Sequence, residues 1–525
     1  MSVLDGADGL HCQPSAIDDP LPPDSMNSIR PELAKERRAS RSAAPRCPGL
    51  FRPTPAQDGW LARVRVPAGI VHSAQMRLLT TLSESVGDAH IDITNRANVQ
   101  LRSLAAPLSA EHLAQMQALG LAAHPRVDPL RNVMASPTAG IDPAQVMDMR
   151  PLAAEIDAFL STHLELANLS PKFSIGLAGG EHVSIRSLPN DVRFSAVRLD
   201  SSLGRRAPLD PLGDVALWLQ LAGVDDLLGW WIAPQDCVAV VGAIAHLYLE
   251  YLDHLDNLVD PAARRPRLKT VLLALGHERV NECLRPFSTH LPVPPPPSLS
   301  DHSPPSRLLG FQNQYQPTLT YIGLALPLGR LTAAQGRGLA DLADAVGSST
   351  LRLTPWRGLL LPDVPQEQVA RVQALLTALQ LDSQTDSVWG GLIACSGTTG
   401  CAASFTDTQR DARAIAQAFQ NQSGLDHPFI IHVSGCAKSC AHHNASDVTL
   451  IGTPNGYELY VAPKLASRQA TESTAGAGGR ATWGKRVQTM LSPDDAPQRA
   501  VQWAQQSRDS PRYTSAVSRP SAGGR

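Results

Sequence analysis

The chain has 525 residues, and its 46 basic and 48 acidic side chains give a formal net charge of −2. A chain of this length can bury several cores, while near-neutral charge excludes the strong overall field that draws proteins to nucleic acid or anionic membranes. The longest apolar run, Cys237 to Leu249, is too short to cross a bilayer, and the first residues lack the basic and apolar regions of a signal peptide. We therefore expect a cytoplasmic protein of about three or four domains, with no nucleic-acid or membrane partner.

The sequence changes character along its length. Residues 1–45 mix Pro, Ser, Asp and Arg without apolar periodicity, which predicts a disordered leader. Residues 291–306 are rich in proline and predict a stiff linker, and from residue 467 onward the chain is a low-complexity tail with one short helix expected around residues 483–506. Four scattered cysteines are expected to be free thiols in a reducing cytosol: Cys12, Cys47, Cys237 and Cys283.

The segments on the two sides of the linker repeat each other at a constant offset of 260 residues. The repeat predicts a strand, a helix and a strand twice, over residues 61–66, 73–86 and 90–94 and again over residues 321–326, 333–346 and 350–354. A small α+β half-domain used twice is therefore predicted. The paired positions include Pro67 and Pro327, Gly69 and Gly329, Gln75 and Gln335, Arg77 and Arg337, Gly87 and Gly347, and Thr94 and Thr354.

Four further cysteines lie close together near the C-terminal end. Cys395 and Cys401 are separated by five residues, and Cys436 and Cys440 by three. Four thiolates are the ligand set of a 4Fe–4S cluster, whereas the wide first spacing disfavours the tight knuckles of a structural zinc site. We expect glycine N–H groups to approach the sulfurs, and a helix beginning at Gly435 would place the second pair of thiols on one face.

The surroundings of these cysteines predict a small sheet. Residues 429–433 are predicted to form a buried strand, and residues 447–452 and 457–461 to form a hairpin around the turn at residues 454–456. The duplication extends weakly into this region, where Ala135 and Gly180 of the first copy are expected opposite Cys395 and Cys436. The first copy is therefore predicted to hold no cluster and to use its basic residues for an anionic ligand.

These residues resemble the sirohaem-dependent sulfite and nitrite reductase superfamily over about residues 47–465. The resemblance is carried by the segment Ser434–Cys440, by Asp447–Leu450 six residues later, and by Ile93–Arg102. It implies an α+β fold of duplicated ferredoxin-like half-domains and two nitrite/sulfite reductase 4Fe–4S-type α/β domains with pseudo-twofold symmetry. The implied domains are a leader (1–45), half-domain 1 (46–122), a first cluster-type domain without cluster cysteines (123–290), the linker (291–306), half-domain 2 (307–380), the 4Fe–4S domain (381–466) and the tail (467–525).

Within the superfamily, three segments are most similar to the precorrin-3B synthase branch: Cys47–Leu50, Leu353–Gly358 and His432–His443. That branch implies an NADH- and O2-dependent monooxygenase of cobalamin biosynthesis, which hydroxylates precorrin-3A and closes a ring acetate into a lactone. The implied cofactor is a 4Fe–4S cluster that relays electrons, with NADH as their source and an electron-donating reductase as partner. A mononuclear iron is a further option, for which His432, His442 and His443 are candidate ligands, with a plain structural role as the alternative.

Basic residues are the candidates for binding the substrate's carboxylates, because guanidinium and ammonium groups form charge-assisted hydrogen bonds with them. By resemblance, Arg96, Arg131 and Lys172 match three residues around the anion in sulfite reductases and are the catalytic candidates. Two positions depart from the reductases: Ser174 replaces a lysine, and Lys438 replaces an asparagine that is frequent there. The predicted substrate-binding residues, for which solvated surface charges are the alternative, are Arg96, Arg102, Arg131, Lys172, Arg357 and Lys438.

Two other functions remain open from sequence. One is a sirohaem sulfite or nitrite reductase, in which the tetrapyrrole is the cofactor and Cys440 bridges the cluster to the haem iron. The other is a scaffold or electron carrier whose cluster is purely structural. The replacement of a lysine by Ser174 weakens the reductase hypothesis, because six-electron reduction of a small anion requires concentrated positive charge at the metal.

Overall fold

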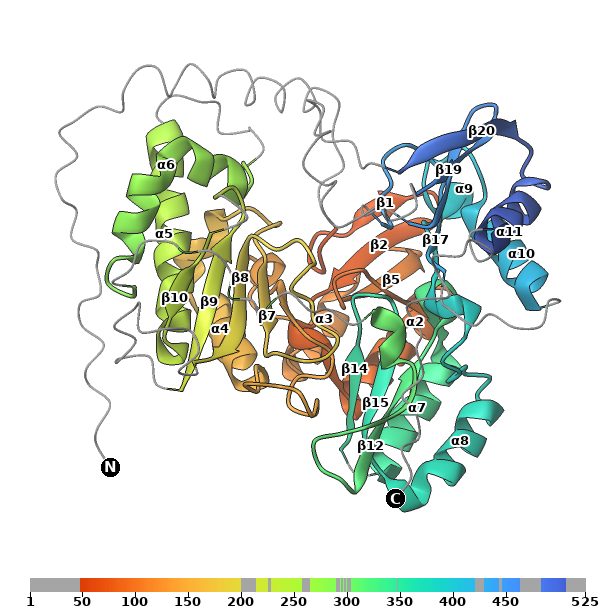
Figure 1. The fold of residues 1–525 in the computed structure, drawn as a ribbon, viewed down its shortest axis with the longest axis horizontal. Coiled ribbons are helices and arrows are strands. Elements are labelled where there is room, and N and C mark those ends of the chain that lie inside the picture. The colour runs from red at the N-terminus through yellow and green to blue at the C-terminus, as the bar shows by residue number, and fades with distance from the viewer. Residues whose placement is uncertain are drawn as a thin grey trace, which may run out of the picture.

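The computed structural model describes residues 48–199, 214–224, 228–256, 265–288, 304–346, 348–420, 429–442, 446–462 and 483–506, and the single positions 293, 296 and 299. The predicted leader, most of the predicted linker and much of the tail lie outside the described residues, as do Cys12, Cys47, Gly347 and His443. The described chain is built on four five-stranded sheets that belong to two pairs of similar modules (Figure 1).

The two half-domains have the same order of elements, and the predicted strand–helix–strand units are confirmed. Helices α2 and α7 begin and end at the predicted residues. The first half-domain contains β1 (Thr54–Ala56), β2 (Gly59–Val64), β3 (Ile70–His72), α2 (Ser73–Val86), β4 (His90–Ile93), β5 (Val99–Leu104) and α3 (Ala110–Ala118). The second contains β11 (Gly310–Asn313), β12 (Leu319–Leu324), β13 (Arg330–Thr332), α7 (Ala333–Val346), β14 (Thr350–Leu353), β15 (Leu359–Pro365) and α8 (Val369–Ala378).

The half-domains exchange one strand each. Strand β3 of the first half-domain pairs with β14 of the second, and β13 of the second pairs with β4 of the first. The sheet orders are therefore β1-β2-β5-β4-β13 and β11-β12-β15-β14-β3. Since Leu79, Ile91, Leu339 and Leu351 lie in one continuous apolar cluster, the two half-domains share a single core.

Backbone conformation repeats at the same offset as the sequence. Left-handed φ angles occur at Ala68 (55°) and Leu328 (56°), and at Ala97 (52°) and Arg357 (62°). Side chains that carry Cβ adopt this region rarely and only where the surroundings demand it. The ion pairs between α2 and α7 repeat at the same offset, because Arg77 binds Asp344 and its counterpart Arg337 binds Glu84, the counterpart of Asp344. The duplication is therefore confirmed in the turns and in the ion pairs.

Two further modules flank the half-domains (Figure 1). We call them the first β-module, with sheet order β10-β9-β8-β7-β6, and the cysteine module, with order β16-β17-β18-β19-β20. The first consists of β6 (Val133–Ala135), α4 (Arg150–Thr162), β7 (Ile175–Ala178), β8 (Val192–Arg198), β9 (Val215–Leu221), β10 (Trp230–Ile232), α5 (Cys237–Asp256) and α6 (Leu268–Leu284). The second consists of β16 (Leu392–Ala394), α9 (Gly397–Gly400), α10 (Thr408–Gln420), β17 (Ile431–Ser434), β18 (Val448–Thr453), β19 (Gly456–Val461), β20 (Lys485–Leu491) and α11 (Ala496–Gln506).

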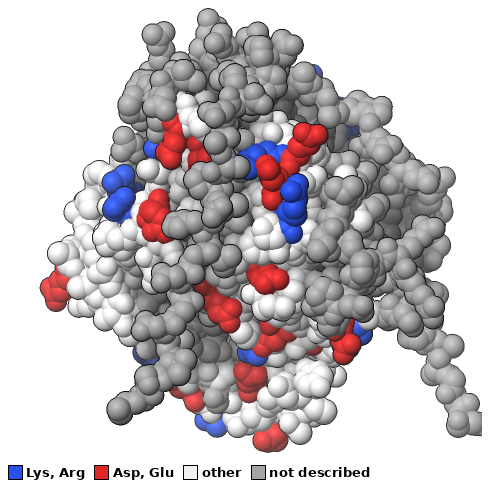
Figure 2. Space-filling model, turned by 90° about the vertical axis from the view of Figure 1, so that its left-hand side faces the viewer, with Lys and Arg blue, Asp and Glu red and all other residues white. Residues whose placement is uncertain are grey.

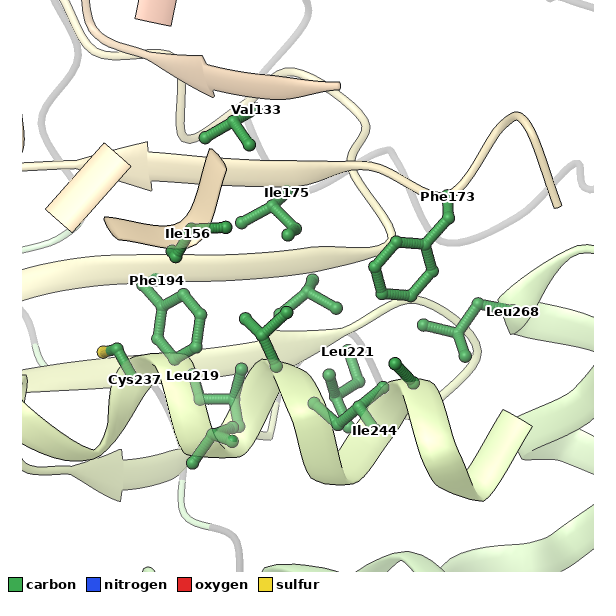
Figure 3. Packing of buried hydrophobic residues seen from close by; sticks show 14 of the residues in the cluster. Val133, Ile156, Phe173, Ile175, Phe194, Leu219, Leu221, Cys237, Ile244 and Leu268 are labelled. Carbon is green, nitrogen blue, oxygen red and sulfur yellow. The ribbon is translucent and has the colours of Figure 1, made fainter. Parts of the chain in front are cut away.

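The core of the first β-module lies between its sheet and the helices α4 and α5. Ile156 of α4 and Ile244 of α5 meet Phe194 and Leu219 of the sheet there, and Figure 3 shows the helix that carries Ile244 lying along the strands. Burying each such side chain contributes about 1.5–3 kcal/mol. In the cysteine module the predicted hairpin is confirmed, because β18 and β19 pair antiparallel around the turn before Gly456.

Helix α5 is the most apolar long helix, yet none of the helices in the described parts of the chain meets the length and hydropathy of a membrane span. Figure 2 shows one side of the molecule, where basic and acidic side chains are interspersed among neutral ones. This distribution agrees with the near-neutral net charge of the chain.

Candidate functional site

Parallel strands bring the cysteines together. Strands β16 and β17 pair in parallel, and Cys395 and Cys436 follow directly after the first and soon after the second. Because the carboxyl ends of parallel strands meet at one edge of a sheet, the two cysteines lie at the same edge. Cys401 ends the short helix α9, and Cys440 lies in the turn after Cys436.

The segment after Gly435 does not form the helix expected from the cysteine spacing. It forms bends and turns, in which Ser439 has a φ of 49° and its N–H group approaches the carbonyl of Cys436 at 3.4 Å. A left-handed residue ends helical propagation at once. The helix predicted from the spacing of Cys436 and Cys440 is therefore wrong, and the backbone there is a turn.

The surroundings of the thiols fit a cluster. The Gly435 N–H group donates to the Cys395 sulfur at 3.2 Å, as the sequence predicted. The Ser439 hydroxyl is buried and has no hydrogen-bond partner among the described residues. A buried hydroxyl without a partner is costly, and a sulfur of a bound cluster would satisfy it.

All four thiols interact electrostatically. Burial raises the pKa of the Cys440 thiol, and Cys436, Cys395 and Cys401 raise it further by like-charge repulsion. Within the described ranges, no group of three or more His, Cys, Asp or Glu side chains is placed to hold a single metal ion. The described residues therefore do not form a site for a mononuclear iron. A 4Fe–4S cluster distributes its four ligands over four irons, so it needs a wider ring of thiols than one ion does.

Two arginines from the half-domains hold the cysteine segments. Arg357, in the turn between β14 and β15, donates to the carbonyls of Ala394 (2.9 Å) and Ala441 (3.4 Å), which adjoin Cys395 and Cys440. Arg102 on β5 donates to the carbonyl of Gly400 (2.9 Å), which precedes Cys401, and forms a two-pronged ion pair with Asp58. These contacts fix three of the four cysteines from outside their own module.

The remaining groups near the cysteines differ in exposure. Lys438 is exposed and lowers the pKa of Cys440, opposing the larger effect of burial. His432 is fully buried on β17, and its ring lies 5.8 Å from that of His442 in an edge-on arrangement. His443, the third histidine considered for a mononuclear iron, is outside the described residues.

A second group of cations lies where the first half-domain meets the first β-module. Arg96, in the turn between β4 and β5, donates to Asn132 (2.9 Å), Asn190 (2.5 Å) and the carbonyl of Pro189 (3.1 Å). Burial lowers its pKa to about 10, so it remains a cation at neutral pH. Arg65 donates to the same Asn132 oxygen at 3.3 Å, which joins two guanidinium groups on one amide.

Arg131 is held by carboxylates instead. Its Nε and Nη2 atoms each donate to Asp157 at 2.9 Å, and Nη2 also reaches the carbonyl of Gly120. Its Nη1 atom is buried without a hydrogen bond and lies 3.9 Å from Asp128, a fully buried carboxylate. Arg131 therefore has one donor atom left, Nη1 with its two N–H groups, and a largely neutralised charge.

Lys172 lies just before the buried residues 173–179 of the first β-module, and Ser174 lies at the start of that segment. Lys172 is half-buried, whereas Ser174 is buried and its hydroxyl donates to Asp191 at 3.0 Å. Arg267 binds the other oxygen of Asp191 at 2.8 Å. The structure thus gathers Arg96, Arg131 and Lys172 at the first β-module and Arg102, Arg357 and Lys438 at the cysteine module.

Neither Arg65 nor Arg267 is among the residues predicted from the sequence. A signal for Arg65 was available, because the position 260 residues later is Ala325. A cation present in one copy of a repeat and absent from the other indicates a role that the copies do not share. Arg96 has the same signature, since its counterpart is Trp356.

The first β-module contains the counterpart of the cysteine site, and here one prediction was wrong. The N–H group of Cys395 bonds the carbonyl of Val433, and the N–H group of Ser136 bonds that of Leu177 in the same way. Ser136, rather than Ala135, is therefore opposite Cys395, because the repeat offset is one residue shorter at this strand. The conclusion that the first copy lacks the cluster thiols is unchanged.

A polar network occupies this counterpart site. Glu181 is buried and accepts from the Gly179 N–H group at 2.8 Å, and Asp142 accepts from Thr138 and from His182. Burial raises the pKa of Glu181 to about 7, against opposing hydrogen bonds that include those from Ser136 and Gly179. The site thus holds a carboxyl group that changes charge near neutral pH.

Replacing Glu181 by Gln is expected to remove a pH dependence of stability. A folded-state pKa above the ordinary value of 4.5 gives stability that is present below the unfolded pKa and is lost as pH rises through the folded pKa. At about 1.4 kcal/mol per pH unit, the wild type should lose roughly 3 kcal/mol relative to Glu181→Gln between about pH 4.5 and 7. Urea unfolding at pH 5 and pH 8 measures this, with exposed Glu165→Gln as control; an unchanged difference between variant and wild type would contradict it.

Comparisons with known proteins agree with this architecture. Residues 54–118 and 312–379 match the nitrite/sulfite reductase ferredoxin-like half domain, and residues 127–204 and 388–486 match the nitrite and sulphite reductase 4Fe-4S domain. The ferredoxin–nitrite reductase of Synechococcus elongatus is 31% identical over 414 residues, which cover 77% of this chain and 78% of that protein.

Two other similar proteins broaden the comparison. The precorrin-3B synthase of a Sinorhizobium species is 28% identical over 415 residues, covering 79% of this chain and 82% of that protein. The solved structure of the Mycobacterium tuberculosis NirA protein superposes with a TM-score of 0.62 at 21% identity, over 84% of this chain and 79% of that one, which is a likeness of fold. The duplicated half-domains, the 4Fe–4S domain with its four cysteines and the extent of these matches lead to one conclusion: the chain belongs to the nitrite and sulfite reductase family.

Proposed function

We propose that the protein is a precorrin-3B synthase, an oxidoreductase that hydroxylates the tetrapyrrole precorrin-3A with dioxygen and electrons that come ultimately from NADH through a partner reductase. The observation that carries this proposal is the state of the cations at the first β-module. Arg131 is largely neutralised by Asp157, and Ser174 is buried against Asp191. Reduction of a small anion needs concentrated positive charge at one point, and these two positions do not supply it.

The remaining cations suit a larger ligand with carboxylates around its rim. Arg96 is oriented by the amides of Asn132 and Asn190, and no carboxylate of the described chain lies within ion-pairing distance of it. Amide acceptors fix a guanidinium group without neutralising it, so it can still bind a substrate carboxylate. Arg96 would thus help to hold the substrate and determine which face meets the oxidant.

The 4Fe–4S cluster, when bound by Cys395, Cys401, Cys436 and Cys440, supplies one electron at a time. The Gly435 N–H group and the arginines that bind the neighbouring carbonyls would help to hold it in place. The similarity to the precorrin-3B synthase of a Sinorhizobium species also supports the proposal, because the match extends over most of both chains.

The test is a single turnover. The purified protein is incubated anaerobically with trimethylated precorrin and reductant, oxygen is admitted, and the product mass is measured. A gain of one oxygen atom is the expected result. No change in mass with a complete cluster would refute the proposal.

A second candidate is a sirohaem nitrite or sulfite reductase, because a ferredoxin–nitrite reductase is 31% identical to this chain. In that case the tetrapyrrole is a bound cofactor and not a substrate. An absorption spectrum of protein purified without oxygen separates the two candidates, since a stoichiometric sirohaem band would favour the reductase. Nitrite- or sulfite-dependent oxidation of a reduced donor would support it further.

Replacing Arg96 by Ala is expected to weaken tetrapyrrole binding while iron content stays normal. Loss of a charge-assisted hydrogen bond costs about 1.5–3 kcal/mol, which corresponds to roughly ten- to hundredfold in affinity. Fluorescence quenching or a spectral titration with the substrate measures the dissociation constant, and exposed Arg413→Ala is the matched control. Unchanged binding would show that Arg96 does not contact the tetrapyrrole, and no binding by the wild type would favour the third possibility, a scaffold or electron carrier.

A further inference from the structure

Arg357 occupies an unusual place for a cation. It lies in the turn between β14 and β15, with a φ of 62°, and its side chain crosses into the cysteine module. The guanidinium Nη1 atom donates to the carbonyl before Cys395, and Nη2 to the carbonyl after Cys440. One side chain therefore ties together two segments that are about forty residues apart in the sequence and that each supply a cluster ligand.

The turn that carries Arg357 packs against Gly329. A Cβ atom added at Gly329 would lie 2.7 Å from the Arg357 Cβ, and Gly69 lies against Ala97 in the same way in the first copy, so the glycine belongs to the repeated turn and the arginine is the difference between the copies. The corresponding turn of the first half-domain has Ala97 in place of Arg357 with the same left-handed conformation. The fold repeats the turn, and only the copy facing the cysteines carries a cation there.

The charge of Arg357 is uncompensated, in contrast to that of Arg102. Arg102 binds both oxygens of Asp58, so this arginine and its partner add no net charge to the site. Within the described chain no carboxylate lies within ion-pairing distance of Arg357, and both partners of its guanidinium are neutral carbonyls. Asp92, a carboxylate that raises the pKa of Arg357 through space, is itself paired with Arg330 at 2.7 Å.

Reduction of the cluster by one electron adds one negative charge to a group already bound by four thiolates. A buried cation nearby stabilises the reduced form more than the oxidised form, and low surrounding polarity strengthens the effect. Burial lowers the pKa of Arg357 and the neighbouring Cys395 raises it, which places the two groups within electrostatic reach of each other.

We propose that Arg357 is a positioning residue that holds both cysteine segments and supplies the fixed positive charge that raises the reduction potential of the cluster. The inference rests on the cluster alone and holds whichever tetrapyrrole chemistry the protein performs. It also explains why an arginine stands here, because its two separate Nη atoms reach two carbonyls at fixed positions, whereas a lysine would have to reach both from a single nitrogen.

The test compares Arg357→Gln and Arg357→Lys with the wild type in the full-length, cluster-loaded protein without substrate. Anaerobic titration with dithionite, followed by electron paramagnetic resonance, gives the midpoint potential of the one-electron couple. Arg357→Gln is expected to shift the midpoint to a more negative potential. Arg357→Lys keeps the charge, so its midpoint should stay near that of the wild type while it loses iron to a chelator faster.

The double variant Asp58→Asn/Arg102→Gln is the matched control, because it removes a donor to a cysteine segment with no change in net charge. It should weaken cluster retention and shift the midpoint less than Arg357→Gln does. A wild-type midpoint in Arg357→Gln with full iron content would overturn the proposal. If the glutamine variant holds no cluster, the lysine variant decides, and a midpoint shifted to a more negative potential in Arg357→Lys would overturn it as well.

Discussion

Replacing Cys436 by Ser is expected to abolish the iron–sulfur cluster and with it all electron transfer. The serine hydroxyl is a hard, largely protonated ligand at neutral pH, whereas iron–sulfur clusters are held by thiolates. Cys436 follows β17 at the sheet edge where Cys395 follows β16, so its loss removes one of the two proposed ligands that the parallel strands bring to that edge. Iron and acid-labile sulfide per chain, together with the visible absorption of the protein, measure the result.

The control is Cys283→Ala, which removes a buried thiol from the core of the first β-module. This variant should lose some stability and keep its full cluster content. Because a bound cofactor stabilises the folded state, the Cys436→Ser protein should also unfold at lower denaturant concentration. Full iron and sulfide in the serine variant would show that Cys436 is not a ligand.

Replacing Arg131 by Met should lower the free energy of unfolding by about 3–5 kcal/mol, because breaking a buried ion pair leaves a carboxylate without its partner. Asp157 would lose two hydrogen bonds of 2.9 Å, and Asp128, which is 1% exposed, would lose its nearest cation on that side. Burial already raises the pKa of Asp128. Urea unfolding at neutral pH measures the loss.

The double variant Arg131→Met/Asp157→Asn separates structure from function. Removing both charges of a buried pair is often nearly neutral, so most of the lost stability should return. Substrate binding, which by resemblance involves Arg131, should not return with it. A double variant as unstable as the single one would show that Asp157 is not the main partner of Arg131.

The sequence was sufficient to predict the repeated half-domains. A constant offset without gaps, together with helical periodicity over residues 73–86 and 333–346, determined both central helices to the residue. The hairpin of β18 and β19 was also predictable, since its turn residues strongly favour one local geometry. What periodicity could not show is the exchange of β3 and β13, because pairing between strands more than two hundred residues apart leaves no local signal.

The candidate site was predictable where chemistry alone selects residues. Four cysteines with unusual spacing indicate a cluster regardless of backbone conformation, although the turn at Ser439 in place of a helix depended on tertiary contacts. The cations were harder, because an arginine that binds Asp157 and one that binds two neutral carbonyls are the same letter in the sequence. Only the structure distinguishes the neutralised Arg131 from the uncompensated Arg357.

The exchange of β3 and β13 has a consequence during synthesis on the ribosome. When the first half-domain has emerged, the outer edge of β4 exposes unpaired N–H and C=O groups until β13 is translated. More than two hundred residues, including the whole first β-module, must leave the exit tunnel in that interval. The nascent chain therefore carries an open sheet edge while a large part of its length is translated, and its yield in a cell should depend on chaperones that shield such edges.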